Sequence, residues 1–245
     1  MQREVLIERF FTALISGRRN DAREVVDELL AAECPADKIL TRLFWPTLEH
    51  IQKLYRSDQM TELAHHYATR LMRMLADQMQ LRLESKASRG RKVLVICGPE
   101  EPEELSAQIV SDLLEADGYE VQFLGGGVAN DEIAAELAET SADVLVAFGA
   151  TPSTVPFTRL LIDKLHDIGA CPNLQIVVGG GVFNRAEGLA EEIGADLWAL
   201  DPEELVEVMD EEPERRMTPD QRTVGRRRRP KPKTKTQTAD EAIAA

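Results

Sequence analysis

Residues 92–125 read KVLVICGPEEPEELSAQIVSDLLEADGYEVQFLG, and they set two apolar runs, KVLVIC and YEVQFL, on either side of a longer segment. The two runs are short and rich in β-branched residues, which is typical of strands. Residues 102–116 repeat their apolar positions at helical spacing. Because a parallel strand pair needs a crossover helix, this order predicts a parallel strand–helix–strand unit.

The same alternation continues toward the C-terminus. Three more strand-like runs follow, DVLVAF (143–148), LQIVVGG (174–180) and DLWAL (196–200), and helical segments are expected at 131–139, 153–167 and 185–193. Five strands alternating with helices predict an α/β domain over residues 92–210, a flavodoxin-like (Rossmann-like) parallel sheet covered on both faces. In such sheets, ligands bind outside the carboxyl ends of the strands.

The N-terminal part has a different pattern. Residues 3–85 show helical periodicity interrupted by turn signals, which predicts a four-helix bundle over residues 1–86, followed by a polar linker at 85–91. In the last helix, the apolar residues recur at three- and four-residue steps and are expected to form the core stripe: Met60, Leu63, Tyr67, Leu71 and Met74. His65 is expected to face solvent.

Residues 211–245 are poor in large apolar residues and rich in proline, threonine and charge. We expect a disordered tail whose removal after Asp210 costs little stability. The chain has a net charge of −14, yet residues 222–235 hold eight basic residues and no acidic ones. The tract Arg226, Arg227, Arg228 and Arg229 could contact nucleic acid weakly through its phosphates, although it lacks aromatic residues for stacking.

Composition excludes several classes of protein. No run of 18 apolar residues occurs and the first residues are charged, so we expect a cytoplasmic protein with no membrane contact. The three cysteines are far apart and form no CxxC pair, which argues against a disulfide framework or a zinc site.

A spaced set of residues in the α/β part resembles a known signature. Glu101-Pro-Glu103-Glu-Leu-Ser106 is followed after 41 residues by Phe148-Gly149-Ala150, and after 28 more by Gly179-Gly180. This spacing resembles DxHxxG…SxL…GG of the cobalamin-binding domain family, whose members include corrinoid proteins and cobalamin-dependent light-sensing regulators. The layout of bundle, linker and flavodoxin-like domain is also similar to that family.

The resemblance implies a cofactor site with unusual residues. The family's cobalt-binding histidine corresponds to Glu103 and its orienting aspartate to Glu101. The serine and leucine that line the slot for the cobalamin nucleotide tail correspond to Phe148 and Ala150. The signature therefore lacks its nitrogen ligand, the slot could be plugged, and no metal ligand is assigned. A second interpretation of Glu101–Glu104 is a helix start, since carboxylates in the first turn offset the helix dipole.

The bundle offers two further candidates. In KLYRSDQMTELAHHYAT, Tyr55 stands where the light-sensing relatives have a tryptophan, and His66 matches the histidine of their Glu-His pair. The resemblance implies that both residues face the upper side of a cobalamin held between the bundle and the α/β domain. His66 could equally be a boundary histidine that packs between the two domains.

Three functions stay open. The first is a non-enzymatic sensor or regulator that binds cobalamin, without histidine ligation, or another tetrapyrrole, and signals to a protein partner such as a transcription regulator. The second is a corrinoid carrier for methyl transfer. The third is a degenerate domain that binds no ligand and serves protein–protein interaction. A homo-oligomer is compatible with all three.

Overall fold

The computed structural model describes residues 3–149, 151–169, 171–217 and 223–225. The chain divides into two compact units with a boundary between Glu84 and Ser85, close to the boundary expected from the sequence. Each unit is described by itself below.

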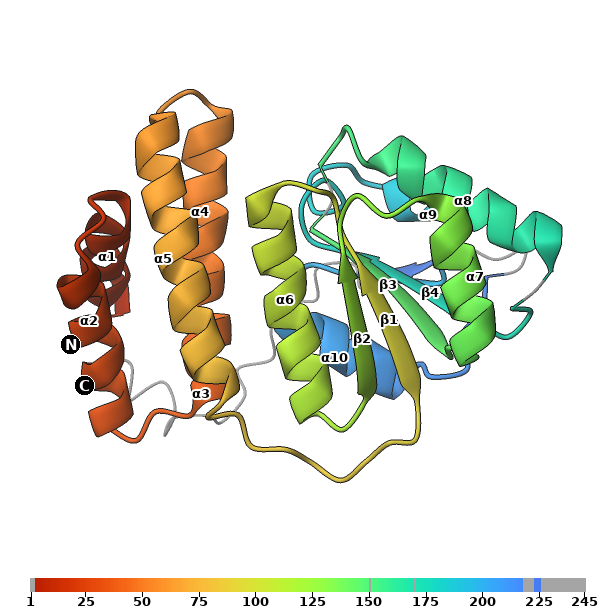
Figure 1. Cartoon of the computed structure of the whole chain (residues 1–245), viewed down its shortest axis with the longest axis horizontal. Coiled ribbons are helices and arrows are strands. Elements are labelled where there is room, and N and C mark those ends of the chain that lie inside the picture. Colours follow the sequence, from red (N-terminus) through yellow and green to blue (C-terminus); the bar gives the residue numbers. More distant parts are fainter. Residues whose placement is uncertain (1–2, 150, 170, 218–222, 226–245) are drawn as a thin grey trace. The chain divides into compact units, whose positions relative to one another are not determined.

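The N-terminal unit is the predicted helical bundle (Figure 1). Its elements are α1 (Arg3–Ile15), α2 (Arg19–Ala31), α3 (Ala36–Ile39), the π-helical segment η1 (Leu40–Phe44), α4 (Trp45–Arg56) and α5 (Glu62–Gln80). Since α3, η1 and α4 follow one another without a break, they form one helix, and the unit has four helices as predicted. The π-helical turn precedes Pro46, whose nitrogen cannot donate a hydrogen bond to the preceding turn.

The buried face of α5 differs from the predicted stripe. Leu63 is 62% exposed and Tyr67 47%, whereas His65 is only 5% exposed. The buried positions of α5 are His65, Ala68, Thr69, Leu71, Met72, Leu75, Ala76 and Met79. The expectation that His65 faces solvent was therefore wrong. Ala68, Met72, Leu75 and Met79 also recur at three- and four-residue steps, and this stripe is the one that packs in the bundle, where α5 contacts α1 and α4.

The second unit is the predicted α/β domain. Its strands are β1 (Lys92–Ile96), β2 (Glu120–Gly125), β3 (Val144–Phe148), β4 (Gln175–Gly179), β5 (Leu197–Ala199) and β6 (Val224–Gly225). They pair in parallel in the order β2-β1-β3-β4-β5-β6. The five predicted strands are confirmed in flavodoxin-like order, and β6 is a short addition at the edge.

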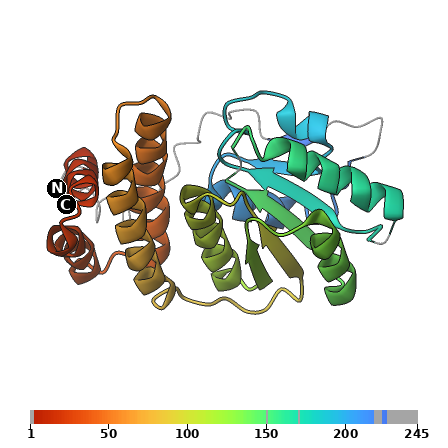
Figure 2. The ribbon, with the colours of Figure 1, turned by 45° about the horizontal axis from the view of Figure 1, so that its top comes forward.

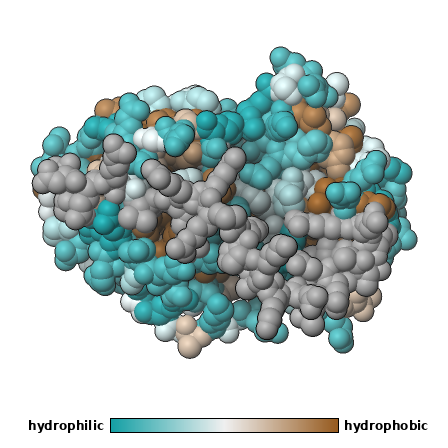
Figure 3. Space-filling model, turned by 180° about the vertical axis from the view of Figure 1, so that it is seen from behind, coloured by the Kyte–Doolittle hydropathy of each residue, from teal (hydrophilic) through white to brown (hydrophobic). Residues whose placement is uncertain are grey.

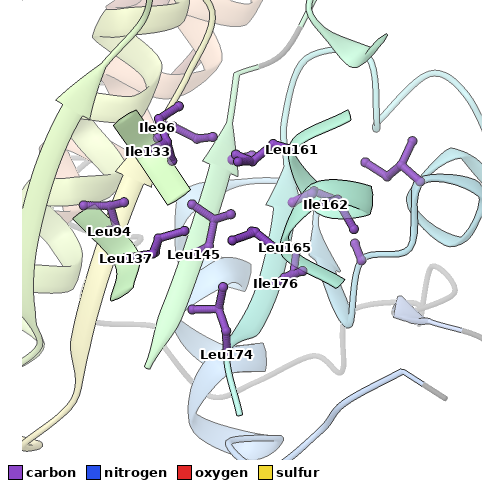
Figure 4. Packing of buried hydrophobic residues seen from close by; sticks show 14 of the residues in the cluster. Leu94, Ile96, Ile133, Leu137, Leu145, Leu161, Ile162, Leu165, Leu174 and Ile176 are labelled. Carbon is purple, nitrogen blue, oxygen red and sulfur yellow. The ribbon is translucent and has the colours of Figure 1, made fainter. Parts of the chain in front are cut away.

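Helices cover both faces of this sheet, as Figure 2 shows. The helices are α6 (Glu101–Ala116), α7 (Asn130–Thr140), α8 (Val155–Ile168), α9 (Leu189–Ile193) and α10 (Pro202–Glu211). On one face α6 packs beside α10, and on the other α7, α8 and α9 are neighbours. Figure 4 shows the core on the second face, where Leu145 of β3 and Ile176 of β4 meet Leu161 and Leu165 of α8.

The segment after α10 corrects the prediction of a disordered tail from residue 211. Residues 212–217 and 223–225, which we call the C-terminal strap, bond to the amino ends of β4 and β5. Gln175 donates from Nε2 to the carbonyls of Glu212 (2.8 Å) and Arg215 (3.1 Å), and β6 extends the sheet beyond β5. The rest of the predicted tail, 226–245, lies outside the described residues, including Arg226, Arg227, Arg228 and Arg229.

A buried carboxylate holds the strap. Asp196, 5% exposed, accepts hydrogen bonds from the backbone N–H groups of Ile176 (2.6 Å) and Met217, and Thr223 donates to the neighbouring carbonyl of Ala195. Burial raises the pKa of Asp196. The buried hydrogen bonds show that this part of the chain is integral to the domain.

Hydrophilic residues predominate on the face of the molecule shown in Figure 3, with hydrophobic residues in small separate patches. Among the described residues, every helix is too short or too polar to span a bilayer.

Candidate functional site

The candidate site lies at the carboxyl edge of the sheet, where β1 and β3 are neighbours and their crossover helices leave on opposite faces. In open α/β sheets, this switch point is the usual place for a ligand. Helix α6 starts beside β1, and the loop 149–154 follows β3. These two connections bring together most of the residues expected from the sequence.

Glu103 points into the domain from the first turn of α6. Its side chain is 3% exposed. Its Oε1 accepts a hydrogen bond from the backbone N–H of Thr151 at 2.7 Å and a longer one from the Thr154 hydroxyl at 3.4 Å. Its Oε2 is buried without a hydrogen-bond partner in the described part of the chain. Burial is the main cause that raises the pKa of this carboxyl.

Glu101 lies two residues earlier in the same turn of α6, partly buried. The first turn also contains Glu103 and Glu104, with Pro102 near its start, so the predicted helix start is confirmed. Favourable interaction with the helix dipole accounts for the three acidic residues in this turn, while the burial of Glu103 requires a further explanation from its neighbours.

Glycines let the loops close around Glu103. A Cβ on Gly98 would collide with the Glu103 carboxyl group, and a Cβ on Gly149 would lie 3.1 Å from both the Glu103 carbonyl oxygen and the Ser106 Cβ. Gly149 also has φ +78°, which favours glycine. Ser106, buried beside it, donates its hydroxyl to the carbonyl of Pro102 at 2.8 Å.

Phe148 fills the space beside the glycine pair at the end of β4. Its side chain is fully buried. A Cβ on Gly179 would lie 2.5 Å from the Phe148 ring, and one on Gly180 would lie 2.8 Å from it. The backbones are joined by a hydrogen bond from Gly149 N–H to the Gly179 carbonyl (3.0 Å). The two glycines therefore accommodate a side chain of this chain.

The bundle residues are arranged around a buried histidine. Tyr55 of α4 stacks on the His65 ring, with centroids 3.9 Å apart and an interplanar angle of 10°. Burial lowers the pKa of His65, and its Nε2 has no hydrogen-bond partner in the described ranges. His66 is half exposed, with Nε2 3.9 Å from a Glu62 carboxylate oxygen.

Sequence reasoning missed Gly98, Thr151, Thr154 and His65. A glycine two residues after β1 and the run Thr-Pro-Ser-Thr after β3 were the available signals for the first three. The candidate Ala150 lies outside the described residues. In the glycine run 125–127, packing requires a glycine at position 126, because a Cβ there would collide with the backbone of Gly98 and Pro99.

Two family models, both described as a B12 binding domain, match this chain, one over residues 91–208 and the other over residues 6–79. The chain belongs to the B12-binding domain family. The two matches cover the α/β domain and the helical bundle, so the family accounts for both units.

The named relatives of this chain are corrinoid proteins. Dimethylamine corrinoid protein 3 of Methanosarcina acetivorans is 25% identical over 211 residues, which cover 83% of this chain and 94% of the relative. A corrinoid protein of Desulfitobacterium hafniense is 29% identical over 105 residues, 43% of this chain and 48% of that protein. The monomethylamine corrinoid protein of Methanosarcina barkeri shares the fold, with a TM-score of 0.73 at 18% identity over 85% of this chain and 98% of that one.

The residues at the candidate site do not fit a cobalamin held through a protein histidine with its tail inserted. The matching position holds Glu103, a carboxylate that is bonded to Thr151 and turned inward. The space beside Gly179 and Gly180 holds the Phe148 ring. A carboxylate is also a harder ligand than imidazole.

Proposed function

We propose that this protein is a corrinoid-binding accessory protein of the carrier type, which presents its cofactor to a protein partner and is not itself an enzyme. The observation that carries the proposal is the match of both modules in the order found in corrinoid proteins. Fold alone does not assign a function, so the proposal depends on binding.

The carrier interpretation replaces the sensor as the preferred one. The relatives named above are corrinoid proteins, and their names mention no regulator. At the level of sequence, the carrier was the second possible function after the sensor. The comparisons favour the carrier over the sensor. A protein partner remains part of the proposal, because a carrier exchanges its cargo with an enzyme, whereas a transcription regulator as that partner has no support.

The structure favours particular roles for the chain's own residues. The carboxyl edge between β1 and β3 offers the binding surface. In the bundle, Tyr55 presents a ring that is 37% exposed, and His65 holds this ring in place by stacking. We expect Tyr55 to contact the flat corrin ring, with His66 near its edge.

Cofactor binding is the direct test. The full chain, purified without cofactor, is mixed with hydroxocobalamin, separated from free cofactor by gel filtration and examined by visible absorption. The proposal predicts one corrinoid retained per chain and weaker retention by Tyr55→Ala. Tyr67→Ala is the matched control, because Tyr67 is a comparably exposed tyrosine outside the candidate site. Failure of the unaltered chain to retain any corrinoid would favour the ligand-free interaction domain instead.

A further inference from the structure

We infer that the α/β domain is closed by its own side chains, with the Phe148 ring occupying the slot that would take the base of a cobalamin tail. A corrinoid bound by this protein would therefore leave its nucleotide tail outside the domain and would take no imidazole ligand from Glu103's position. The part concerning a bound corrinoid depends on the proposed function. The closure of the slot does not depend on it.

The first step is the position of Phe148. The ring comes from the last residue of β3 and reaches the last residue of β4 and the glycine after it, across two paired strands. It is fully buried, and each of the two glycines would collide with it if it carried a Cβ. An aromatic ring is thus already packed at the glycine pair, and a second ring would need the same volume.

The second step is that Glu103 closes the neighbouring connection independently. Its carboxyl group lies against Gly98 at the end of β1 and accepts a hydrogen bond from Thr151 after β3. The loops after these strands are therefore joined by a buried contact. Opening the edge there would break this hydrogen bond and expose a side chain packed in the interior.

Benzimidazole, the aromatic part of the cobalamin base, tests the slot without any corrinoid. Phe148→Ala removes the ring, and a cavity lined by apolar groups can bind a small aromatic molecule of matching size. We expect benzimidazole to raise the thermal midpoint of the full-length Phe148→Ala variant but not that of the unaltered chain. Leu161→Ala is the control, because Leu161 is fully buried in the hydrophobic cluster on the α7–α8 face of the sheet, and this cluster does not include Phe148.

Three results of this measurement contradict the inference. Equal stabilisation of the unaltered chain would mean that the slot is open. Stabilisation of Leu161→Ala but not of Phe148→Ala, or of neither variant, would mean that the ring does not stand in a base-shaped slot. If Phe148→Ala does not fold, Phe148→Leu, which keeps an apolar side chain of smaller size, is measured in the same way.

Corrinoid affinities then test the binding mode. The unaltered chain should bind hydroxocobalamin and the tail-less cobinamide with affinities that agree within about twofold, since the tail makes no contact. The variant Glu103→His with Phe148→Ser should prefer cobalamin by about tenfold or more, because it offers a nitrogen donor and an open slot. The corrinoid's own base also gives nitrogen hyperfine structure after reduction to cobalt(II), so the histidines of the protein are isotopically labelled. Hyperfine structure that changes with this label should appear only in this variant.

The outcomes separate the two proposals. If the unaltered chain prefers cobalamin about tenfold and shows protein imidazole on cobalt, the closed slot is wrong while the carrier function stands. If the unaltered chain binds neither corrinoid and benzimidazole stabilises only Phe148→Ala, the carrier function is wrong while the closed slot stands.

Discussion

Glu103 imposes a steric constraint on Gly98 that can be measured. The φ angle of Gly98 is not positive, so its backbone suits alanine, yet an added methyl group would collide with the Glu103 carboxyl group. We expect Gly98→Ala to lower the free energy of unfolding of the α/β domain by about 1–3 kcal/mol, the usual cost of overpacking. Urea denaturation followed by circular dichroism would measure it.

The same substitution should cost less where the carboxyl group is absent. In a Glu103→Ala background, the loss caused by Gly98→Ala should shrink by about 1 kcal/mol or more, because the two sites are in contact. Glu104→Ala provides the matched background, since Glu104 lies in the same helical turn. Equal costs in the three backgrounds would show that Glu103 does not occupy the space beside Gly98.

His65 gives the bundle a pH dependence. Because burial lowers its pKa below the ordinary value of 6.5, the unfolded chain takes up a proton more readily than the folded one. This contribution is constant above the ordinary pKa and is lost as the pH falls through it toward the lowered value. The free energy of unfolding of the bundle should therefore decrease on acidification from pH 8 to pH 5, as denaturation at each pH would measure.

Substitution of His65 separates its contribution to this pH dependence from the contribution of the carboxylates. His65→Phe keeps a ring for Tyr55 to stack on and removes the titrating group, so the decrease between pH 8 and pH 5 should become smaller. His66→Gln is the control, because His66 is half exposed and its removal should leave most of the decrease in place. The assignment to His65 is wrong if both variants retain the full pH dependence.

At the scale of the elements, the contacts of the C-terminal strap predict that its removal destabilises the α/β domain. The sequence alone predicted that removal after Asp210 costs little stability. Truncation after Asp210 removes the acceptors of Gln175 and the N–H donor of Met217 to Asp196, and it also removes β6. At about 1 kcal/mol for each hydrogen bond, the thermal midpoint of the α/β domain should fall by roughly 5–10 °C.

Truncation after Gly225 is the matched control and should leave that midpoint close to that of the full chain, because it keeps every described contact of the strap. Calorimetry resolves the transitions of the two units. Identical thermal midpoints for the two truncated chains would show that the strap does not stabilise the domain, as the sequence alone predicted for everything after residue 210.

The elements differ in how far the sequence could predict them. The five strands were predictable because their apolar runs alternate with amphipathic helices. β6 has two residues and therefore no periodicity, and its pairing depends on Asp196 and Thr223, which contact residues distant in sequence. In α5, the burial of His65 depends on stacking with Tyr55, and this contact was not visible from spacing within one helix.

At the scale of the whole molecule, the spacing of the signature located the candidate site, whereas its side-chain arrangement could not be predicted. The motif gave the positions of Glu103 and Phe148. Glu103 turns inward because Gly98 leaves room for its carboxyl group and Thr151 donates a hydrogen bond to it. Phe148 is buried because Gly179 and Gly180 leave room for its ring. A family pattern can therefore name positions that the fold brings to one edge of the sheet while leaving open which side chains fill the space there.

The strap also matters while the protein is being made. A ribosome releases the chain from its N-terminus, so β5 emerges before the residues that cover its edge and bond to Asp196. Until then the nascent domain presents an unpaired strand edge, a surface prone to association with other chains. Premature termination between α10 and β6 would make that exposure permanent, and such products should be found among aggregated or degraded material.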